Sequence, residues 1–414
     1  MSEKTTSIIP PKPEPRINLR RPDIMEAVQA QVEGHYRSEI VDRLRAGDSR
    51  LQVGDVAIRL AKEFGFCYGV ERAIDLAYAA RRVFAGSSLY ILGEIIHNPE
   101  VNHQIQALGI QNLAGPSREA DIDRLSEDDV VILPAFGAER EMLEKIRAKG
   151  CRIVDTTCGD VMSVWKRVQQ NARETVTSII HGKVAHEETR ATASRAISED
   201  GRGHYLIVRD LPEADIVCGY IRSGGDREKF LERFRGAYSP GFDPDRDLDV
   251  VGVANQTTMM RGETEEIQDR IRRAITERWG EANVTAHFRF FDTICGATQA
   301  RQDALGRMLA EPMDLLLVIG GYNSSNTTHL AEMGEARLPT FFIKNGEKIL
   351  SSDRILHFDI HRHVERETAG WLPNGPVTIG VTAGASCPNN LIEEVLIRVF
   401  ELRGISRSEM AAAS

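Results

Sequence analysis

The chain has 414 residues, with 61 acidic and 52 basic side chains and a formal net charge of −9. This acidic balance, together with the lack of a basic stripe or an Arg-Gly tract, argues against a nucleic-acid partner. The longest apolar runs, such as 315–319, are too short to span a bilayer, and the proline- and charge-rich N-terminus differs from a signal peptide, so we expect a cytoplasmic enzyme.

The first part of the chain differs in pattern from the rest. Residues 1–22 are rich in proline and charge, which predicts disorder, and residues 23–47 have the pattern of an amphipathic helix that ends at Gly47. We therefore interpret 1–52 as an N-terminal extension. From residue 53 onward, short apolar runs alternate with amphipathic helical segments, which is typical of an α/β fold with parallel sheets.

One sequence pattern occurs three times in the α/β region. Apolar residues lead to a cysteine and then to a helical pattern, at Cys67 ("FGFCYG"), Cys158 ("DTTCGD") and Cys295 ("DTICGA"). We therefore expect all three cysteines at helix starts. Each is followed by two strands that end in polar loops, at 89–100 and 130–141, 177–189 and 249–260, and 315–327 and 377–388.

This self-similarity predicts three copies of one unit. We place them at 53–150, 151–287 and 288–390, followed by a C-terminal helix and tail at 391–414. The cysteines are separated by 91 and then 137 residues, so the second unit is longer than the first. We expect the extra length as a surface insertion near 198–247.

The three cysteines suggest a shared metal site. Loops at the carboxyl ends of parallel strands carry ligands, and three units around a pseudo-threefold axis would bring three thiolates to one point. Helix starts lower thiolate pKa values and suit a negatively charged iron-sulfur cage. A [4Fe-4S] cluster held by three cysteines has one open iron that can act as a Lewis acid.

Two other uses of the cysteines compete with an iron-sulfur site. Zinc prefers closely spaced ligand pairs in structural sites and usually includes histidine in catalytic ones, which argues against zinc here. A single cytosolic cysteine is usually part of a core, but the repeated context argues against that interpretation for these three. Cys218 lies in an apolar segment and Cys151 at the opposite end of a strand, so we expect both in the core. Cys387 follows Ser386 in a loop toward the centre, so we expect it beside the site.

The loops after the strands are polar and mostly uncharged. Such donors can hold a diphosphate without a lysine-rich pocket. Asn98 and Asn323 are interpreted as helix caps. Either Glu187 or Glu188 is expected to carry a proton, and the other to favour the helix dipole. The loop residues are His97, Asn98, His186, Glu187, Glu188, Gln256, Thr257, Thr258, Asn323, Ser324, Ser325, Asn326 and Ser386.

Eight motifs in this order resemble those of one family. They are "FGFCYGVERAI", "EIIHNPEV", "DTTCGDV", "AHEET", "NQTT", "DTICGAT", "NSSN" and "GVTAGAS". Over residues 58–400 the chain resembles the 4-hydroxy-3-methylbut-2-enyl diphosphate reductases, the IspH/LytB family. Its N-terminal helix and longer second unit resemble the long form found in cyanobacteria and plastids.

The resemblance implies a trefoil of three α/β units around a central [4Fe-4S] cluster. It also implies the two-electron reductive dehydroxylation of an allylic diphosphate to isopentenyl and dimethylallyl diphosphates, the closing step of the non-mevalonate isoprenoid pathway. The electrons would come from an external donor, a ferredoxin or a flavodoxin.

Individual roles follow from the matching motifs. Cys67, Cys158 and Cys295 resemble the cluster ligands. Glu188 resembles the glutamate that delivers a proton, which selects it over Glu187, and Thr257 resembles the active-site threonine. The positions that resemble the substrate-holding residues are His97, His186, Ser324, Ser325, Asn326 and Ser386.

One residue departs from the pattern of the shorter family members. Phe136, followed by Gly137, stands where they have histidine, and a phenyl ring cannot donate a hydrogen bond to a phosphate. A phosphate contact is therefore lost or supplied elsewhere, and Lys183 is the candidate for supplying it.

Three other functions compete with this interpretation. A related three-cysteine design such as quinolinate synthase also uses an open cluster iron, but it does not explain "AHEET" together with "NSSN". An iron-sulfur sensor needs no diphosphate site. A dinucleotide-dependent dehydrogenase would need a strand leading into a G-x-G-x-x-G motif followed by an acidic residue, and this sequence has no such combination.

Overall fold

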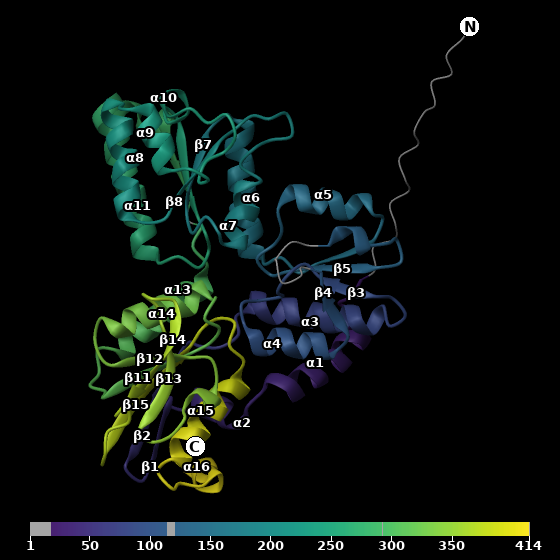
Figure 1. Cartoon of the computed structure of the whole chain (residues 1–414), viewed down its shortest axis with the longest axis vertical. Coiled ribbons are helices and arrows are strands. Elements are labelled where there is room, and N and C mark those ends of the chain that lie inside the picture. Colours follow the sequence, from purple (N-terminus) through teal and green to yellow (C-terminus); the bar gives the residue numbers. More distant parts are fainter. Residues whose placement is uncertain (1–17, 114–120, 292, 414) are drawn as a thin grey trace.

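The computed structural model describes residues 18–113, 121–291 and 293–413. Figure 1 shows three lobes that meet at the middle of the molecule, drawn in blue, in teal, and in green to yellow. Each lobe is built on its own β-sheet, with helices packed on the sheet faces. No helix in the described ranges combines the length and apolar character needed to cross a lipid bilayer.

The first lobe contains four parallel strands. The strands are β3 (Leu89–Ile91), β4 (Ile110–Asn112), β5 (Val130–Leu133) and β6 (Arg152–Asp155), and the helices are α3 (Tyr68–Val83), α4 (Pro99–Ala107), η1 (Ile122–Arg124) and α5 (Arg140–Ala148). The strand order is β4-β3-β5-β6. Every residue of β5 is buried, as expected for a parallel strand covered on both faces.

The second lobe repeats this sheet. Its strands are β7 (Thr177–His181), β8 (Tyr205–Val208), β9 (Val251–Asn255) and β10 (Phe288–Phe290). Its helices are α6 (Gly159–Arg173), α7 (Glu187–Ala193), α8 (Leu211–Ser223), α9 (Arg227–Arg233), α10 (Pro244–Asp247), α11 (Arg261–Trp279), η2 (Glu281–Asn283) and α12 (Val284–His287). The order is β8-β7-β9-β10, and all pairs are parallel.

The third lobe takes its strands from both ends of the chain. They are β1 (Arg50–Val53), β2 (Val56–Leu60), β11 (Leu315–Ile319), β12 (Thr340–Ile343) and β15 (Val377–Ala383), in the order β12-β11-β15-β2-β1. Only β1 is antiparallel to its neighbour in this sheet. The remaining elements are α13 (Gly296–Met308), α14 (Ser325–Glu335), η3 (Gly346–Lys348), α15 (Asn389–Glu401), α16 (Arg407–Ala413) and a hairpin of β13 (Arg354–Asp359) and β14 (Val364–Ala369).

The prediction of an α/β protein with three parallel-sheet units is confirmed. The unit borders, however, differ from 53, 151 and 288. The strand before each cysteine pairs within the preceding sheet: β6 with β5, β10 with β9, and β2 with β15. An apolar pattern identifies a strand but not its partner, because pairing is decided by tertiary packing. Each lobe therefore ends at a cysteine and the next lobe begins there.

The expected insertion is only partly a surface feature. Residues 205–208 form β8, which pairs with β7, and α8 packs against α11 with Val217 and Ile221 fully buried. These residues belong to the second lobe because their apolar side chains complete its core. The extra length lies mainly between β8 and β9, where α8, α9 and α10 stand in place of the short helix η1 between β4 and β5 of the first lobe.

The N-terminal extension forms two helices where one was predicted over 23–47. They are α1 (Pro22–Tyr36) and α2 (Glu39–Ala46), and Ser38 starts the second by accepting a hydrogen bond from the Val41 N–H. Helix α1 packs on α3 and α2 packs on α15, so the extension contacts the first and third lobes. The predicted disorder falls largely on residues 1–17, which lie outside the described residues.

Candidate active site between the three sheets

Three cysteines occupy the position immediately before a helix. Cys67 precedes α3, Cys158 precedes α6 and Cys295 precedes α13, each with extended backbone. The expectation that all three lie at helix starts is confirmed. Since every lobe ends at one of these residues, the three cysteines come from the three lobe borders.

Gly69 lies against two of the three sulfurs. A Cβ atom added at Gly69 would lie 2.6 Å from Sγ of Cys158 and 3.9 Å from Sγ of Cys67. The third cysteine reaches the same region, because the Cys295 thiol is hydrogen-bonded to Asp160 and interacts electrostatically with Cys67. Because Gly69 has no side chain, the sulfur atoms of Cys158 and Cys67 fit next to it, in the same region as Cys295.

The thiols of Cys158 and Cys295 are less acidic than their helix-start positions suggested. Burial raises the pKa of Cys158, and burial together with the Asp160 carboxylate raises the pKa of Cys295 to about 12. Backbone N–H groups at the helix starts lower both pKa values, but by less than burial raises them. The expected lowering is therefore outweighed, and a metal that binds these residues has to displace the thiol protons.

The other cysteines belong to cores. Cys218 is fully buried in the second lobe, and Cys151 contacts the Ile146 carbonyl next to β6, as expected. Cys387, expected beside the site, is fully buried in the core of the third lobe, where its Sγ faces the Pro388 carbonyl.

Glu188 and Thr257 form a buried pair in the second lobe. Glu188, on α7, is 2% exposed, and Thr257 follows β9. The Thr257 N–H donates to Oε1 at 2.5 Å and its Oγ1 donates to Oε2 at 3.0 Å. Burial raises the pKa of Glu188 to about 7, although the bonds from Thr257 lower it. A carboxyl group with this pKa can hold and release a proton near neutral pH.

Asp160 connects this carboxyl group to the cysteine region. Its charge contributes to the raised pKa of Glu188 and to that of Cys295. Sequence reasoning did not single out Asp160. Its position two residues after Cys158, in "CGD", was the available signal.

Two histidines and a phenylalanine form an aromatic cluster. His97 precedes α4 and His186 precedes α7, and their ring centroids lie 5.0 Å apart at 77°. Phe136 stacks on His97 with centroids 4.5 Å apart and the planes within 8°. The phenyl ring that departs from the family pattern therefore fixes the plane of a histidine.

His186 has a defined hydrogen-bond pattern. Its Nδ1 accepts the Glu188 N–H at 3.2 Å, so in the neutral ring the hydrogen is on Nε2. Burial, His97 and Lys183 hold the pKa of His186 well below its usual range, which favours that neutral ring. The Nε2 atoms of His186 and His97 are buried and have no hydrogen-bond partner among the residues that the structure describes. Such atoms commonly mark a place where a ligand binds.

Glu94 fixes the other nitrogen of His97. Its Oε2 lies 3.1 Å from His97 Nδ1 and accepts a hydrogen bond from Asn323 Nδ2 at 2.7 Å. Asn98 caps α4 as expected, but the interpretation of Asn323 as a cap is wrong: Ser324 is the N-cap of α14. Glu94, three residues before His97 in "EIIH", was not singled out from the sequence.

The polar loops of the third lobe adjoin the other two lobes. Ser325 Oγ accepts from Gln256 Nε2 at 3.1 Å, and Ser386 Oγ donates to the His97 carbonyl at 3.0 Å. Asn326 Oδ1 accepts the Ala385 N–H at 2.9 Å, while its Nδ2 is buried and has no partner in the described ranges.

Gln256 joins further parts of the site. Its Oε1 accepts from the Lys183 N–H and from Thr189 Oγ1, at 3.2 and 3.0 Å. The positive charge of Lys183 helps to lower the pKa of His186. The structure thus brings the predicted polar residues of all three lobes next to one another.

Comparisons with known proteins agree with this arrangement. A family model described as LytB protein matches residues 58–400. The chain is 50% identical over 391 residues to 4-hydroxy-3-methylbut-2-enyl diphosphate reductase of Gloeobacter violaceus, covering 93% of this chain and 92% of that one. It is 47% identical over 382 residues to the enzyme of that name from Thermosynechococcus vestitus, covering 92% and 93%.

Two solved structures are similar to most of this chain. One is described as (E)-4-hydroxy-3-methyl-but-2-enyl diphosphate reductase, the terminal enzyme of the non-mevalonate pathway; it has a TM-score of 0.51 and 26% identity, with coverage of 83% of this chain and 99% of that chain. The other, the reductase from Plasmodium falciparum, has a TM-score of 0.59 and 21% identity, covers 83% and 87%, and supports the fold alone. The chain therefore belongs to the LytB protein family.

Proposed function

We propose that this chain is a 4-hydroxy-3-methylbut-2-enyl diphosphate reductase, the terminal enzyme of the non-mevalonate pathway. It removes the allylic hydroxyl group of its substrate as water, using two electrons and two protons, and forms isopentenyl and dimethylallyl diphosphates. The observation that carries the proposal is the approach of three lobe-border cysteines to a region next to the buried Glu188–Thr257 pair. Family membership and the names of the relatives support the same activity.

Cys67, Cys158 and Cys295 are the residues that would hold a [4Fe-4S] cluster. Their donor set consists of thiols only, which is the set that such clusters take, and Gly69 makes room for two of the sulfurs. When bound, the cluster supplies electron transfer and, at the iron without a cysteine ligand, Lewis-acid chemistry. The electrons come from an external carrier, a ferredoxin or a flavodoxin.

The diphosphate lies against the polar loops. The Nε2–H of His186 is a buried donor, and Asn326 Nδ2 is another, from a different lobe. His97, Ser324, Ser325 and Ser386 complete the set of residues that hold the substrate. When the diphosphate is anchored, the carbon chain has one orientation. The reacting groups are then already positioned and need not meet by chance.

Glu188 supplies the proton for the leaving group. The two bonds from Thr257 fix its carboxyl group, and a pKa of about 7 leaves a large protonated fraction near neutrality. As the C–O bond breaks, this proton joins the hydroxyl group and water departs. The allyl group accepts two electrons and then a second proton at either of its ends, which accounts for two products.

The test is anaerobic purification with iron and sulfide analysis, followed by turnover with a reduced low-potential donor. We expect about four iron and four sulfide per chain. We also expect release of both products from the hydroxylated allylic diphosphate. Protein that contains no iron, or iron-loaded protein that forms neither product, would refute the proposal.

A further inference from the structure

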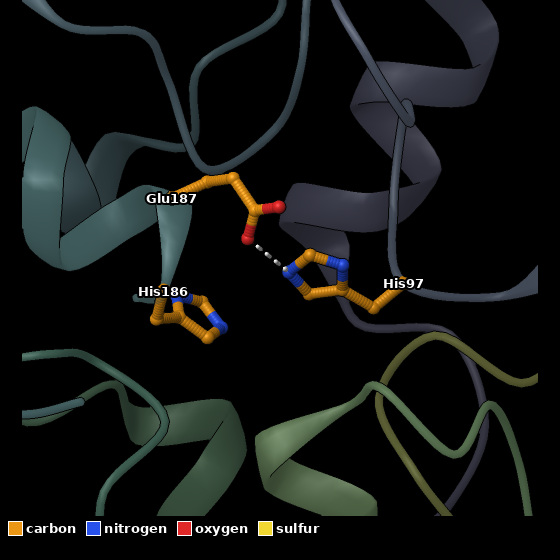
Figure 2. A group of neighbouring side chains, drawn as sticks. All are labelled: His97, His186 and Glu187. Carbon is orange, nitrogen blue, oxygen red and sulfur yellow. Dashed lines mark ion pairs between the residues drawn. The ribbon is translucent and has the colours of Figure 1, made fainter. Parts of the chain in front are cut away.

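Glu187 points into the same space as the two histidines. It is the first residue of α7, and its Oε2 lies 3.8 Å from Nε2 of His97. Figure 2 shows the carboxylate directed at the His97 ring with the His186 ring beside it. The side chain of Glu187 is 44% exposed, whereas that of His97 is 13% exposed. A partly exposed carboxylate thus faces a buried ring nitrogen.

His97 does not need Glu187 to stay in place. Its Nδ1 is already held by Glu94, and its ring plane is fixed by the stack on Phe136. The Glu187 contact, at 3.8 Å, is longer than the Glu94 contact, at 3.1 Å. Glu187 is therefore not the residue that holds the His97 ring, and its contact is with the side of the ring that has no hydrogen-bond partner in the described residues.

Two histidines and a carboxylate also resemble a metal site, since their ligand atoms lie within 4.8 Å of one another. The hydrogen bonds of His186 argue against this use. A neutral ring whose Nδ1 accepts the Glu188 N–H carries its hydrogen on Nε2, and a protonated nitrogen cannot ligate a metal. Without His186, only His97 and Glu187 of this group remain as ligands, fewer than the three protein ligands of a catalytic zinc site.

We propose that Glu187 competes with the substrate diphosphate for Nε2 of His97 and so lowers the affinity of the site. This inference rests on the proposed function of the site. Because the Glu94 carboxylate accepts the hydrogen of Nδ1, Nε2 of His97 carries a hydrogen only in the doubly protonated ring, and that one hydrogen serves one strong acceptor. A carboxylate about 4 Å from a phosphate oxygen also repels it. Binding therefore requires Glu187 to turn toward solvent, which its exposure permits.

The kinetic consequence is specific. A residue that opposes the binding of the diphosphate group opposes substrate and products alike, whereas the C–O bond breaks beside Glu188 rather than Glu187. Loss of the Glu187 charge should then lower KM and leave kcat nearly unchanged, because ground state and transition state gain equally.

The test uses the iron-loaded holoenzyme and Glu187→Gln, which removes the charge and keeps the shape. We expect KM for the substrate to fall roughly fivefold, and Kd for inorganic pyrophosphate, measured by calorimetry, to fall by about the same factor. Glu94→Gln should act in the opposite direction, because it removes the carboxylate that holds His97. Glu141→Gln on α5 is the charge control, since Glu141 is 79% exposed and pairs with Lys145.

An unchanged or higher Kd for pyrophosphate in Glu187→Gln would overturn the proposal. So would Zn²⁺ that binds the wild type, strengthens pyrophosphate binding and loses both effects in Glu187→Gln, because Glu187 would then be a metal ligand. The pyrophosphate measurement needs no turnover. A wild type that binds pyrophosphate but does not reduce the allylic substrate would refute the proposed function and leave the competition intact.

Discussion

Glu188 and Thr257, 69 residues apart in sequence, are joined through both oxygens of one buried carboxyl group. One bond comes from the Thr257 main chain and the other from its hydroxyl group, so the carboxyl plane is fixed relative to β9. The position of a proton on Glu188 is thereby tied to the scaffold of the second lobe.

Replacing Glu188 with glutamine should abolish most turnover while the iron and sulfide content stays the same. The amide keeps the size of the side chain but cannot deliver the proton, and loss of such a group typically costs about 10²–10⁴-fold in rate. Single-turnover kinetics together with iron and sulfide analysis of the same preparation measures both properties. Full activity in this variant would remove Glu188 from the role of acid.

The pH dependence of kcat/KM should report Glu188 in the free enzyme. The protonated form is the active one, so kcat/KM should be highest below the pKa of about 7 and fall as the pH rises through it. Thr257→Val removes the Oγ1 bond, which lowers this pKa, so the alkaline decline should move to higher pH. The pH profiles of wild type and variant give the comparison, and a shift to lower pH would contradict the assignment.

Cys158→Ser should lose or destabilise the cluster, because a hydroxyl group is a poor substitute for a thiolate ligand. Cys218→Ala is the matched control, since Cys218 is buried in the core of the second lobe away from the lobe borders. Iron and sulfide per chain, measured anaerobically, should drop in the first variant only. An intact and fully active cluster in Cys158→Ser would contradict its role as a ligand.

Gly69→Ala should have a similar effect without removing any sulfur. The added methyl group would lie 2.6 Å from Sγ of Cys158, which is too close for either atom to remain in place. Gly219→Ala tests the same substitution in a helix where an added Cβ meets no atom within 4 Å apart from its chain neighbours and the helix's own backbone. We expect the cluster content to fall in Gly69→Ala and to stay at the wild-type level in Gly219→Ala.

Phe136→Ala should raise KM with little change in kcat. Stacked aromatic pairs contribute about 0.5–1.5 kcal/mol, so loss of the support for His97 should raise KM about two- to tenfold. Phe136→His restores a flat ring and adds a hydrogen-bond donor, so its KM should not rise. Equal KM values for Phe136→Ala and the wild type would show that the stack has no part in binding.

The sequence contained the local features of the site. The sequence pattern around Cys67, Cys158 and Cys295 predicted helix starts, because the apolar residues that follow repeat at helical spacing. The strands that end in polar loops were equally readable, since apolar runs bounded by glycine and polar residues are local signals. These signals located the positions that the structure brings together.

Strand pairing, burial and loop conformation could not be predicted from the sequence in the same way. Which sheet takes β2, β6 or β10 depends on partners far away in the chain, so each predicted border lies one strand too early. The burial that raises the pKa of Cys295 is a tertiary property as well. Asn323 lies one residue before the true cap, a difference that only the loop conformation decides.

The pairing of β2 with β15 has a consequence for biosynthesis. The strand that leads to Cys67 is synthesised long before its neighbour in the sheet, which lies far later in the chain. The first lobe border therefore acquires its final geometry only after β15 has been made. Insertion of iron and sulfide should follow synthesis of β15, and a nascent chain that stops before residue 377 should not retain the cluster.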